Sequence, residues 1–413
     1  MDSIEIPHYF ICPISLQIME DPVTTITGIT YDRRSIERWI FVEHNTTCPV
    51  TNQPLFPNSS GVTPNHTLRR LIQSWCTTNA SRGVDRIPTP RAPLDNRAVL
   101  DLLRGLCDPQ QQLNSLKTAA ALVAESESNR RCMVQHGVAE CMAKLIISCC
   151  RSNHTDRVEL CLTILHSLRL TPDELKPILV ANNSDLIDEL TWVLLHGSNN
   201  NSEMITTTTT TNTAAALVLK SIIEVTSDAV LERLNLDFFK AVSSLIHDRI
   251  SNQVTKAALH VILHACPWGR NRAKIVESGA MKEVIELELA SPDKRTTELD
   301  LAILDHLCSC ADGRAELIRH AAGIAVVAKR ILRASPSADD RAVRILLSIC
   351  RYSATGEVLQ EMVRVGAVSK LCFVMQANCS TSVKEKARWV LRLHSGVWKN
   401  SPCIDAYLLT RYP

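Results

Sequence analysis

The cysteines and histidines near the N-terminus are considered first, because these side chains bind zinc or act as nucleophiles. Residues 1–75 contain Cys12, Cys48, His8, His44 and His66. A structural zinc ion takes four such ligands, usually in pairs separated by two to four residues. No Cys-x-x-Cys pair exists in this stretch. We therefore expect no metal site and no cofactor.

Cys12 could act instead as a catalytic thiolate. Such a thiol needs a lowered pKa, supplied by a neighbouring histidine or cation, and the histidine is in turn oriented by a third group. The sequence around Cys12 does not show the histidine-and-acid pattern that would activate the thiol. We expect this residue to pack in the domain and not to form a covalent intermediate.

Short segments rich in turn residues must position these side chains. Asp21-Pro22 opens an extended run, Thr27-Gly28 forms a turn, and the chain returns through Tyr31. This pattern predicts a β-hairpin. Asp32 follows as the N-cap of a helix that begins at Arg33.

Two apolar loops flank the hairpin and helix. Each begins with a Cys-Pro dipeptide, at Cys12-Pro13 and at Cys48-Pro49. Proline fixes φ and removes a backbone donor, so these segments are loops and not strands. A further helix is expected from Asn65.

A hairpin and a helix between two loops is the plan of a RING finger, whose two zinc ions need eight Cys or His ligands. The ligands present are too few for two such sites. Hydrogen bonds and ion pairs must hold the loops instead, although their pairing does not follow from the sequence. The candidates are Glu20, Asp21, Asp32, Arg33, Arg34, Ser35, Glu37, Arg38 and Glu43.

The N-terminal segment IPHYFICPISLQIMEDPVTTITGITYDRRSIERWI, with CPVTNQPL and TPNHTLRRLIQSW after it, resembles the U-box, a metal-free relative of the RING. The match covers about Ile6 to Cys76 and is most similar to plant U-box proteins that carry armadillo repeats. The resemblance implies a ubiquitin ligase of the RING/U-box type, which forms no covalent ubiquitin intermediate. Its implied partners are a ubiquitin-conjugating enzyme, ubiquitin and a protein substrate on the repeats. It also implies plant defence or stress signalling.

In such a ligase the chemistry belongs to the conjugating enzyme, and the ligase contributes proximity and orientation. We therefore expect no catalytic residue in this chain. The resemblance places an apolar groove for the conjugating enzyme at Ile14, Leu16, Trp39 and Pro49, with Cys12 at its border. Core packing for the first three and a turn for Pro49 are the plainer alternatives; we favour the interface.

Asn52 marks a departure from the family. Many RING and U-box domains carry a basic residue shortly after the second loop, thought to contact ubiquitin. Here that position is Asn52, whose amide can donate a hydrogen bond but carries no charge. Two interpretations follow: ubiquitin transfer is weaker, or another residue takes this role.

The rest of the chain repeats itself. NRRCMVQHGVAECMAKLI (129–146) aligns without gaps on NRAKIVESGAMKEVIELE (271–288). Equivalent turn positions recur every 42 to 54 residues, at Gly137, Asn183, Asp237, Gly279, Ala321 and Gly366. A period of 40–47 residues in helical sequence is typical of armadillo or HEAT repeats. We expect an all-α armadillo-repeat solenoid of about six repeats.

These observations predict three parts. Residues 1–76 form the small α+β U-box domain, 77–94 a linker with three prolines, and 95–413 the repeats. The stretch 197–213 holds six consecutive threonines without a core pattern, and we expect a flexible insert there.

Composition excludes several classes of protein. The chain has 413 residues, of which 45% are apolar and 4% aromatic, a mix that suits helix packing. A net charge of +2 gives no indication of nucleic-acid binding. No run of 18 apolar residues and no signal peptide is found, so the 16 cysteines indicate free thiols in a reducing compartment. We expect a soluble cytoplasmic protein without an integral membrane segment, and leave open the nucleus and a homo-oligomer through the U-box.

The alternative is a non-catalytic armadillo adaptor with a degenerate or dimerising U-box. Asn52 supports it. The apolar set Ile14, Leu16, Trp39 and Pro49 opposes it, because a decayed interface would not need to keep exposed apolar residues.

Overall fold

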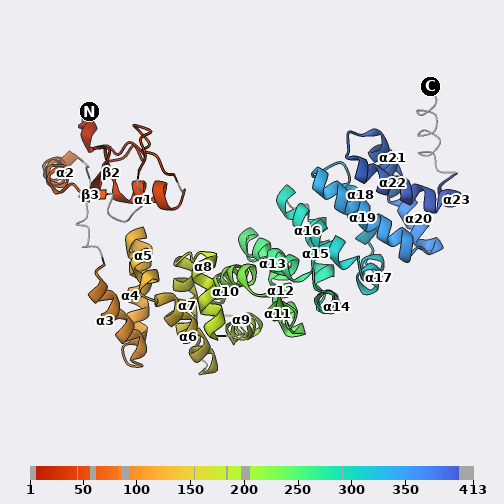
Figure 1. The fold of residues 1–413 in the computed structure, drawn as a ribbon, viewed down its shortest axis with the longest axis horizontal. Helices are drawn as coiled ribbons and strands as arrows, with labels where there is room; N and C mark the ends of the chain where they lie inside the picture. Colours follow the sequence, from red (N-terminus) through yellow and green to blue (C-terminus); the bar gives the residue numbers. More distant parts are fainter. Residues whose placement is uncertain are drawn as a thin grey trace. The chain divides into compact units, whose positions relative to one another are not determined.

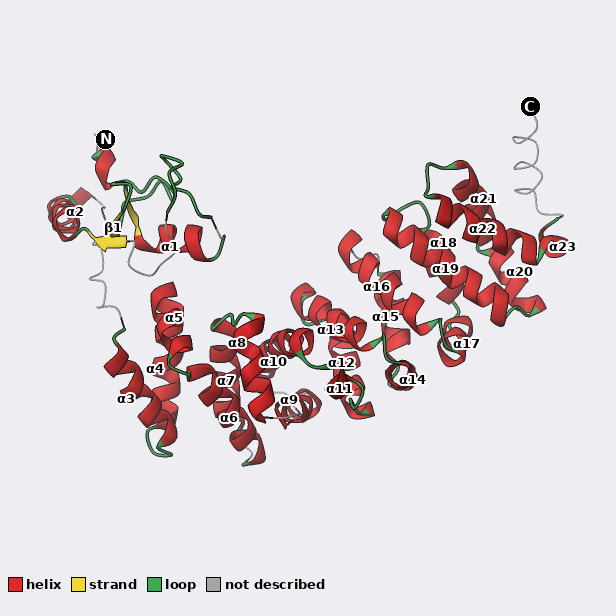
Figure 2. Ribbon diagram, viewed as in Figure 1, coloured by secondary structure: helices red, strands yellow, loops and turns green. Residues whose placement is uncertain are grey.

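The computed structural model describes residues 6–43, 45–55, 62–82, 84, 94–152, 154–182, 185–196, 205–290 and 293–399. The chain divides into two compact units, Met1–Met142 and Ala143–Pro413. The first unit holds a small domain with a sheet and the first helices of the repeats, and the second unit consists of helices (Figures 1 and 2). Most of the predicted linker lies outside the described residues, so the predicted domain boundaries stay predictions.

The small domain is built on a three-stranded antiparallel sheet with the order β2-β1-β3. Val23 pairs with Tyr31 on one side and with Pro64 on the other. The predicted hairpin is confirmed, and its turn uses Gly28 at φ +79°. The third strand was not predicted, because three residues that end in proline carry no alternating pattern. The strands are β1 (Pro22–Thr25), β2 (Thr30–Asp32) and β3 (Val62–Pro64).

Two helices, α1 (Arg33–Phe41) and α2 (His66–Thr78), pack against the sheet and the loops. Short 3-10 helices, η1 (His8–Phe10) and η2 (Ala80–Arg82), flank the domain. Burial of each large apolar side chain contributes about 1.5–3 kcal/mol. The buried core consists of Phe10, Cys12, Met19, Val23, Tyr31, Ile36, Cys48, Leu55, Ile72 and Cys76.

Asp32 precedes α1 as predicted, but its side chain does not cap the helix. Its Oδ1 accepts hydrogen bonds from the backbone N–H groups of Glu20 and Asp21, at 3.0 Å each. The expected side-chain cap is therefore wrong, because the carboxylate instead satisfies two backbone donors where the chain leaves the first loop.

The repeat region begins in the first unit with α3 (Asn96–Cys107), α4 (Gln112–Glu125) and α5 (Glu127–Gln135). Helix α6 (Val138–Arg151) carries the boundary between the units. From α5 onward the helices recur in threes, and α5 and α6 are the first and second helices of the triplet that ends with α7 (Thr155–Ser167). The first helices of the later triplets are α8 (Pro172–Asn182), α11 (Asp228–Leu231), α14 (Gly269–Glu277), α17 (Ala311–Arg319) and α20 (Gly356–Arg364).

The second helices of the later triplets are α9 (Asp185–His196), α12 (Leu236–Asp248), α15 (Ala280–Leu289), α18 (Gly323–Arg330) and α21 (Ala367–Gln376). The third helices are α7 (Thr155–Ser167), α10 (Ile205–Val225), α13 (Asn252–Ala265), α16 (Lys294–Leu307), α19 (Pro336–Tyr352) and α22 (Thr381–Leu393). Each third helix contacts the next, from α7 to α22 (Figure 1). This continuous row confirms the predicted helical repeats, and α23 (Ser395–Trp398) follows it. Within the described part of the chain, no helix is long and apolar enough to cross a membrane.

All three predicted turn glycines have the left-handed backbone that the turn requires. Gly137, Gly279 and Gly366 have φ of +78°, +84° and +76°, each directly before the second helix of a triplet. Only glycine adopts this conformation without a steric penalty. The predicted turn at Asp237 is wrong, because this residue lies in the first turn of α12. Asn183 lies outside the described residues.

The expected flexible insert at 197–213 is wrong from Ile205 onward, where α10 begins. Asn212 is buried, and the Thr213 hydroxyl donates to the carbonyl of Thr209 at 2.7 Å. Threonine hydroxyls in a helix commonly bond the carbonyl one turn earlier. Thr210 also hydrogen-bonds Glu159 of α7, so packing and hydrogen bonds overcome the low helix propensity of threonine. Residues 197–204 lie outside the described part.

A buried acidic pair lies where α15, α16 and α18 meet. Asp300 has no exposed surface and Glu288 is 2% exposed. Arg330 forms an ion pair with Glu288, and the Thr297 hydroxyl donates to the same carboxylate at 3.3 Å. Burial, together with the neighbouring Glu288, raises the pKa of Asp300 well above its usual range. Asp300 is thus favoured in its protonated form in the folded chain.

We expect Asp300→Asn to stabilise the protein more at pH 8 than at pH 5. A raised pKa in the folded state means that the stability from this group is present at low pH and is lost as pH rises. The asparagine does not titrate, so its advantage should grow with pH, to about 1–3 kcal/mol near pH 8. Urea unfolding at the two pH values measures this. The exposed Asp312, changed to Asn, is the control, and an equal shift in the Asp300 variant at both pH values would contradict the prediction.

Candidate functional site

The first loop of the small domain is closed by its own backbone. The Cys12 N–H donates to the Gln17 carbonyl at 2.8 Å, and the Leu16 N–H donates to the Cys12 carbonyl at 2.9 Å. An isolated β-bridge between Ile11 and Ile18 closes its base. Four residues at the tip therefore project from a fixed frame.

The second loop repeats this geometry. The Cys48 N–H donates to the Gln53 carbonyl at 2.8 Å, and the Asn52 N–H donates to the Cys48 carbonyl at 2.9 Å. An isolated bridge between Thr47 and Pro54 closes its base. Cys-Pro-Ile-Ser-Leu-Gln and Cys-Pro-Val-Thr-Asn-Gln are thus equivalent turns that bracket the hairpin and α1.

The fifth residue of each turn has a left-handed backbone. Leu16 has φ +55° and Asn52 has φ +56°. Asparagine tolerates this region, whereas a residue such as leucine is strained there by roughly 1–2 kcal/mol. Leu16 is also 76% exposed, so burial does not offset the strain. A strained, exposed apolar residue indicates a role in binding.

The two cysteine sulphurs connect the loops to the hairpin. Cys12 Sγ accepts the backbone N–H of Asp32 at 3.3 Å. Cys48 Sγ accepts the Thr27 hydroxyl at 3.4 Å and shares a hydrogen bond with the Tyr31 hydroxyl at 3.0 Å. Burial alone would raise the pKa of Cys48, but hydrogen bonds from Thr27, Thr51 and Tyr31 lower it to about 6. Across the described residues every cysteine is a free thiol, and no group of three or more His, Cys, Asp or Glu residues is placed to hold a metal ion.

The charged candidates of the sequence form three pairs in the structure. Arg33 Nε lies 2.6 Å from Asp21, and its Nη1 lies 3.6 Å from Glu37. Arg38 pairs with Glu43 at 3.3 Å, but both side chains are exposed, so this pair contributes little. The Asp21–Arg33 pair and the Asp32 carboxylate together attach the end of the first loop to the start of α1.

The five predicted interface residues differ in exposure. Cys12 is fully buried, so it supports the loop from below and does not offer a contact surface. Ile14, Trp39 and Pro49 are half-buried, and Leu16 is exposed. Ile14 and Trp39 both pack against the domain core.

Trp39 also joins α1 to the second loop, because its indole N–H donates to the Thr47 carbonyl at 2.8 Å. This hydrogen bond holds the indole at the base of the loop that carries Pro49. Val50, next to Pro49, is 52% exposed and was not predicted as a site residue. The signal that could have identified it is its equivalence to Ile14, as the residue after Cys-Pro.

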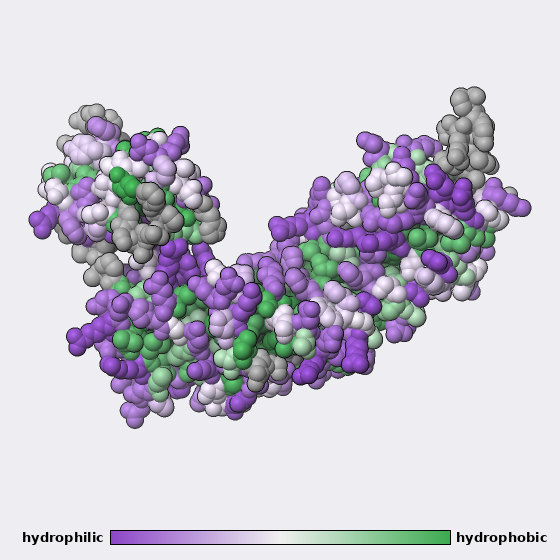
Figure 3. Space-filling view, viewed as in Figure 1, coloured by the Kyte–Doolittle hydropathy of each residue, from purple (hydrophilic) through white to green (hydrophobic). Residues whose placement is uncertain are grey.

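Figure 3 shows hydrophobic residues among hydrophilic ones on the visible face of both units.

We expect Cys12 and Cys48 to react with iodoacetamide at least tenfold more slowly than Cys107 in the native protein, since buried thiols react only through local opening. Cys107 is exposed and serves as the internal reference. Peptide mass spectrometry after timed alkylation measures the three rates. Fast alkylation of Cys12 would contradict its packing role and reopen the question of a nucleophilic thiol.

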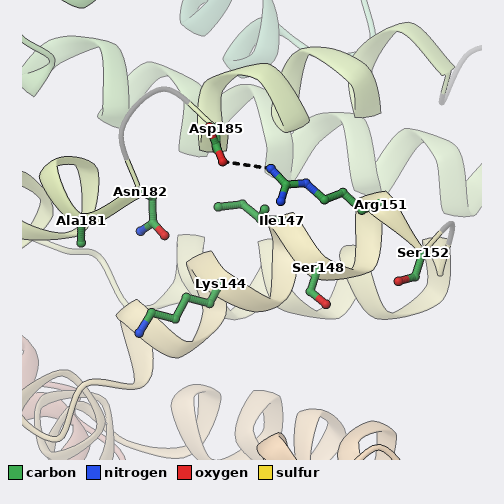
Figure 4. Close-up of a pocket in the computed structure, with 8 residues that line it drawn as sticks. All are labelled: Lys144, Ile147, Ser148, Arg151, Ser152, Ala181, Asn182 and Asp185. Carbon is green, nitrogen blue, oxygen red and sulfur yellow. Dashed lines mark hydrogen bonds and ion pairs between the residues drawn. The ribbon is translucent and has the colours of Figure 1, made fainter.

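The repeats offer a second site, an open hollow of about 450 Å³. Figure 4 shows Lys144 at one end and Arg151 directed at Asp185. Arg151 pairs with Asp185 at 2.9 Å and with Glu189 at 3.2 Å, so its charge is neutralised. The hollow thus combines hydroxyl, amide and paired charged groups, which suits a polar contact more than a catalytic centre. Its lining residues are Lys144, Ile147, Ser148, Arg151, Ser152, Ala181, Asn182 and Asp185.

A small domain closed by hydrogen bonds, followed by stacked helical triplets, is the architecture of U-box ubiquitin ligases with armadillo repeats. The U-box domain family model matches residues 6–81, and the model described as "Plant U-box protein ARM repeat region" matches residues 98–413. The chain belongs to this family of plant U-box proteins. The predicted fold class, a small U-box domain followed by an armadillo-like helical region, is confirmed.

Known relatives agree with this assignment. E3 ubiquitin-protein ligase PUB23 of Arabidopsis thaliana is 43% identical, over 100% of this chain and 98% of its own length. E3 ubiquitin-protein ligase PUB22 of the same plant is 40% identical, over 100% and 99%. The chain is therefore an E3 ubiquitin ligase of the U-box class, and the alternative of a non-catalytic adaptor loses its support.

One solved structure shows the repeat fold. It is described as "A conserved phosphorylation switch controls the interaction between cadherin and beta-catenin in vitro and in vivo", and it covers 80% of this chain and 58% of its own. The TM-score is 0.57 and the sequence identity 13%, so the likeness concerns the fold alone.

Proposed function

We propose that the U-box binds a ubiquitin-conjugating enzyme charged with ubiquitin, and that the armadillo repeats bind the protein substrate. The observation that carries the first part is Leu16, an apolar side chain that is 76% exposed on a strained backbone. A single exposed apolar residue is ordinary, but a strained backbone that keeps it exposed is an outlier of the kind that marks a binding site.

The proposed contact surface for the conjugating enzyme comprises Ile14, Leu16, Trp39, Pro49 and Val50. Hydrogen bonds within each loop fix both tips, and the bond from Trp39 to Thr47 fixes the helix against the second loop. A rigid apolar surface supports binding because little conformational entropy is lost on association.

The proposed mechanism is orientation without a covalent intermediate on this chain. The ligase holds the conjugating enzyme and the substrate together, so that a substrate lysine attacks the thioester at high effective concentration. Cys12 is fully buried and its sulphur already accepts the Asp32 N–H, which leaves it without access to a thioester. The acyl transfer then passes directly from the conjugating enzyme to the lysine.

Asn52 is the proposed ubiquitin contact. It is exposed at the tip of the second loop, in the position equivalent to Leu16. Its amide can donate to a ubiquitin carbonyl, but a neutral donor forms a weaker bond than a guanidinium. We infer that Asn52 restrains ubiquitin less firmly than a basic residue would.

The repeats supply the proposed substrate surface. The row of third helices from α7 to α22 presents side chains from successive repeats, and such rows form extended binding surfaces. Near the end of the row, Trp389 and Leu393 lie one turn apart on α22 with exposed fractions of 62% and 43%. We further propose action in the cytoplasm, with the nucleus left open, in plant defence or stress responses, on the basis of the family resemblance.

Leu16→Ala is expected to reduce auto-ubiquitination roughly tenfold or more, because a central apolar anchor of an interface is typically worth 2 kcal/mol or more. Stability should not fall, because the side chain is exposed and strained. A gel assay with activating enzyme, conjugating enzyme and ATP measures the rate. Ile26→Ala is the control, because Ile26 is 55% exposed and belongs to the hairpin turn instead. Equal activity of the two variants would remove Leu16 from the interface.

Asn52→Arg is expected to accelerate ubiquitin discharge from the conjugating enzyme by roughly three- to tenfold, because a charge-assisted hydrogen bond is about twice as strong as a neutral one. Single-turnover discharge onto free lysine measures this step without a protein substrate. Asn52→Gly keeps the left-handed backbone and removes the donor, so it should be slower than the wild type. If both variants behave like the wild type, Asn52 does not contact ubiquitin.

A further inference from the structure

Helix α1 carries a buried carboxylate. Glu37 is 4% exposed, although the adjacent Arg38 side chain is 74% exposed. Its ion-pair partner in the domain is Arg33, at 3.6 Å. Charged side chains are almost never this buried on a surface helix unless another element covers them.

The element that covers Glu37 is α5, which follows α3 and α4 at the start of the repeat region. Helices α1 and α5 are in contact, and the backbone of Ser128 on α5 lowers the pKa of the Glu37 carboxyl group. Ser128 lies in the first turn of α5, where free N–H groups and the helix dipole stabilise a negative charge. Burial raises the pKa of Glu37 against the effect of Arg33, and Glu127 raises it further.

A second contact lies one turn away on both helices. The guanidinium of Arg131 stacks on the ring of Phe41, with its central carbon 3.5 Å from the ring centre. Phe41 follows Glu37 by four residues on α1, and Arg131 follows Ser128 by three on α5, so each pair shares one helix face. Two matched features, a carboxylate beside the first turn of α5 and a cation over an aromatic ring, make the two faces complementary.

We propose that Glu37 and Phe41 form an intramolecular docking site for the first half of α5. This site holds the U-box against the first helices of the repeats. The U-box is then attached by a packed contact as well as by the chain between α2 and α3. The inference rests on geometry within the first unit and is independent of the proposed function.

The docking site leaves the proposed conjugating-enzyme surface open. Trp39 is two residues from both Glu37 and Phe41, which on an α-helix turns it to the opposite side. Leu16 and Val50 keep exposed fractions of 76% and 52%. One face of α1 thus serves docking and the other faces the second loop, so the ligase surface is presented in a defined orientation.

Hydrogen–deuterium exchange of the full-length chain tests the docking by asking whether a change on one helix affects the other. Arg131→Glu on α5 should raise amide exchange in α1 by about fivefold, because it removes the stacking and places a third acid near Glu37 and Glu127. Peptides of the hairpin at 22–32 should be unchanged, which shows that the U-box stays folded.

Phe41→Ala on α1 gives the reciprocal measurement and should raise exchange in α5. The control is Arg104→Glu, which makes the same charge change on the 79% exposed Arg104 side chain of α3 and should leave α1 unchanged. If each variant alters exchange only in its own helix, the two helices do not dock and the proposal is overturned.

Discussion

The small domain depends on hydrogen bonds that attach its two loops to the hairpin. The Asp32 carboxylate accepts two backbone N–H groups at the exit of the first loop, and the sulphurs of Cys12 and Cys48 accept donors from the hairpin and its surroundings. In an interior of low dielectric such bonds are strong, and each loses its value when one partner is missing. The loops, and the apolar tips that they present, are fixed because this network is complete around them.

The hairpin, the start of α1 and the two Cys-Pro loops could be predicted, because glycine, proline and aspartate restrict the backbone locally. The role of Asp32 could not, because the sequence places it at a helix start whereas its partners lie eleven and twelve residues earlier. The candidate site was predicted from a family pattern. The strain at Leu16 could not be predicted, because a left-handed leucine has no sequence signal and arises from the closure of the loop around it.

In the repeat region, too, some features could be predicted from the sequence and others could not. Three glycines predicted the turns, because only their backbone tolerates that conformation, whereas Asp237 was misplaced by counting along a regular period. The threonine run was misread because its pattern lacks apolar residues, and the partners that make it helical lie on α7. The buried pair of Glu288 and Asp300 likewise has no local signal. Both residues lie on helices whose meeting point is set by the stacking of repeats.

The equivalence of the two Cys-Pro turns has a consequence for how this domain can change. Backbone groups of the cysteine, the fifth residue and the glutamine close each turn, while the side chains at the third and fifth positions take no part in these closing bonds. Mutations at the exposed Leu16, Val50 and Asn52 can therefore accumulate without loss of the scaffold, whereas Ile14 also packs against the core. A pair of variable tips on one fixed frame lets the exposed surface of the domain change while the hydrogen bonds that hold the frame are kept.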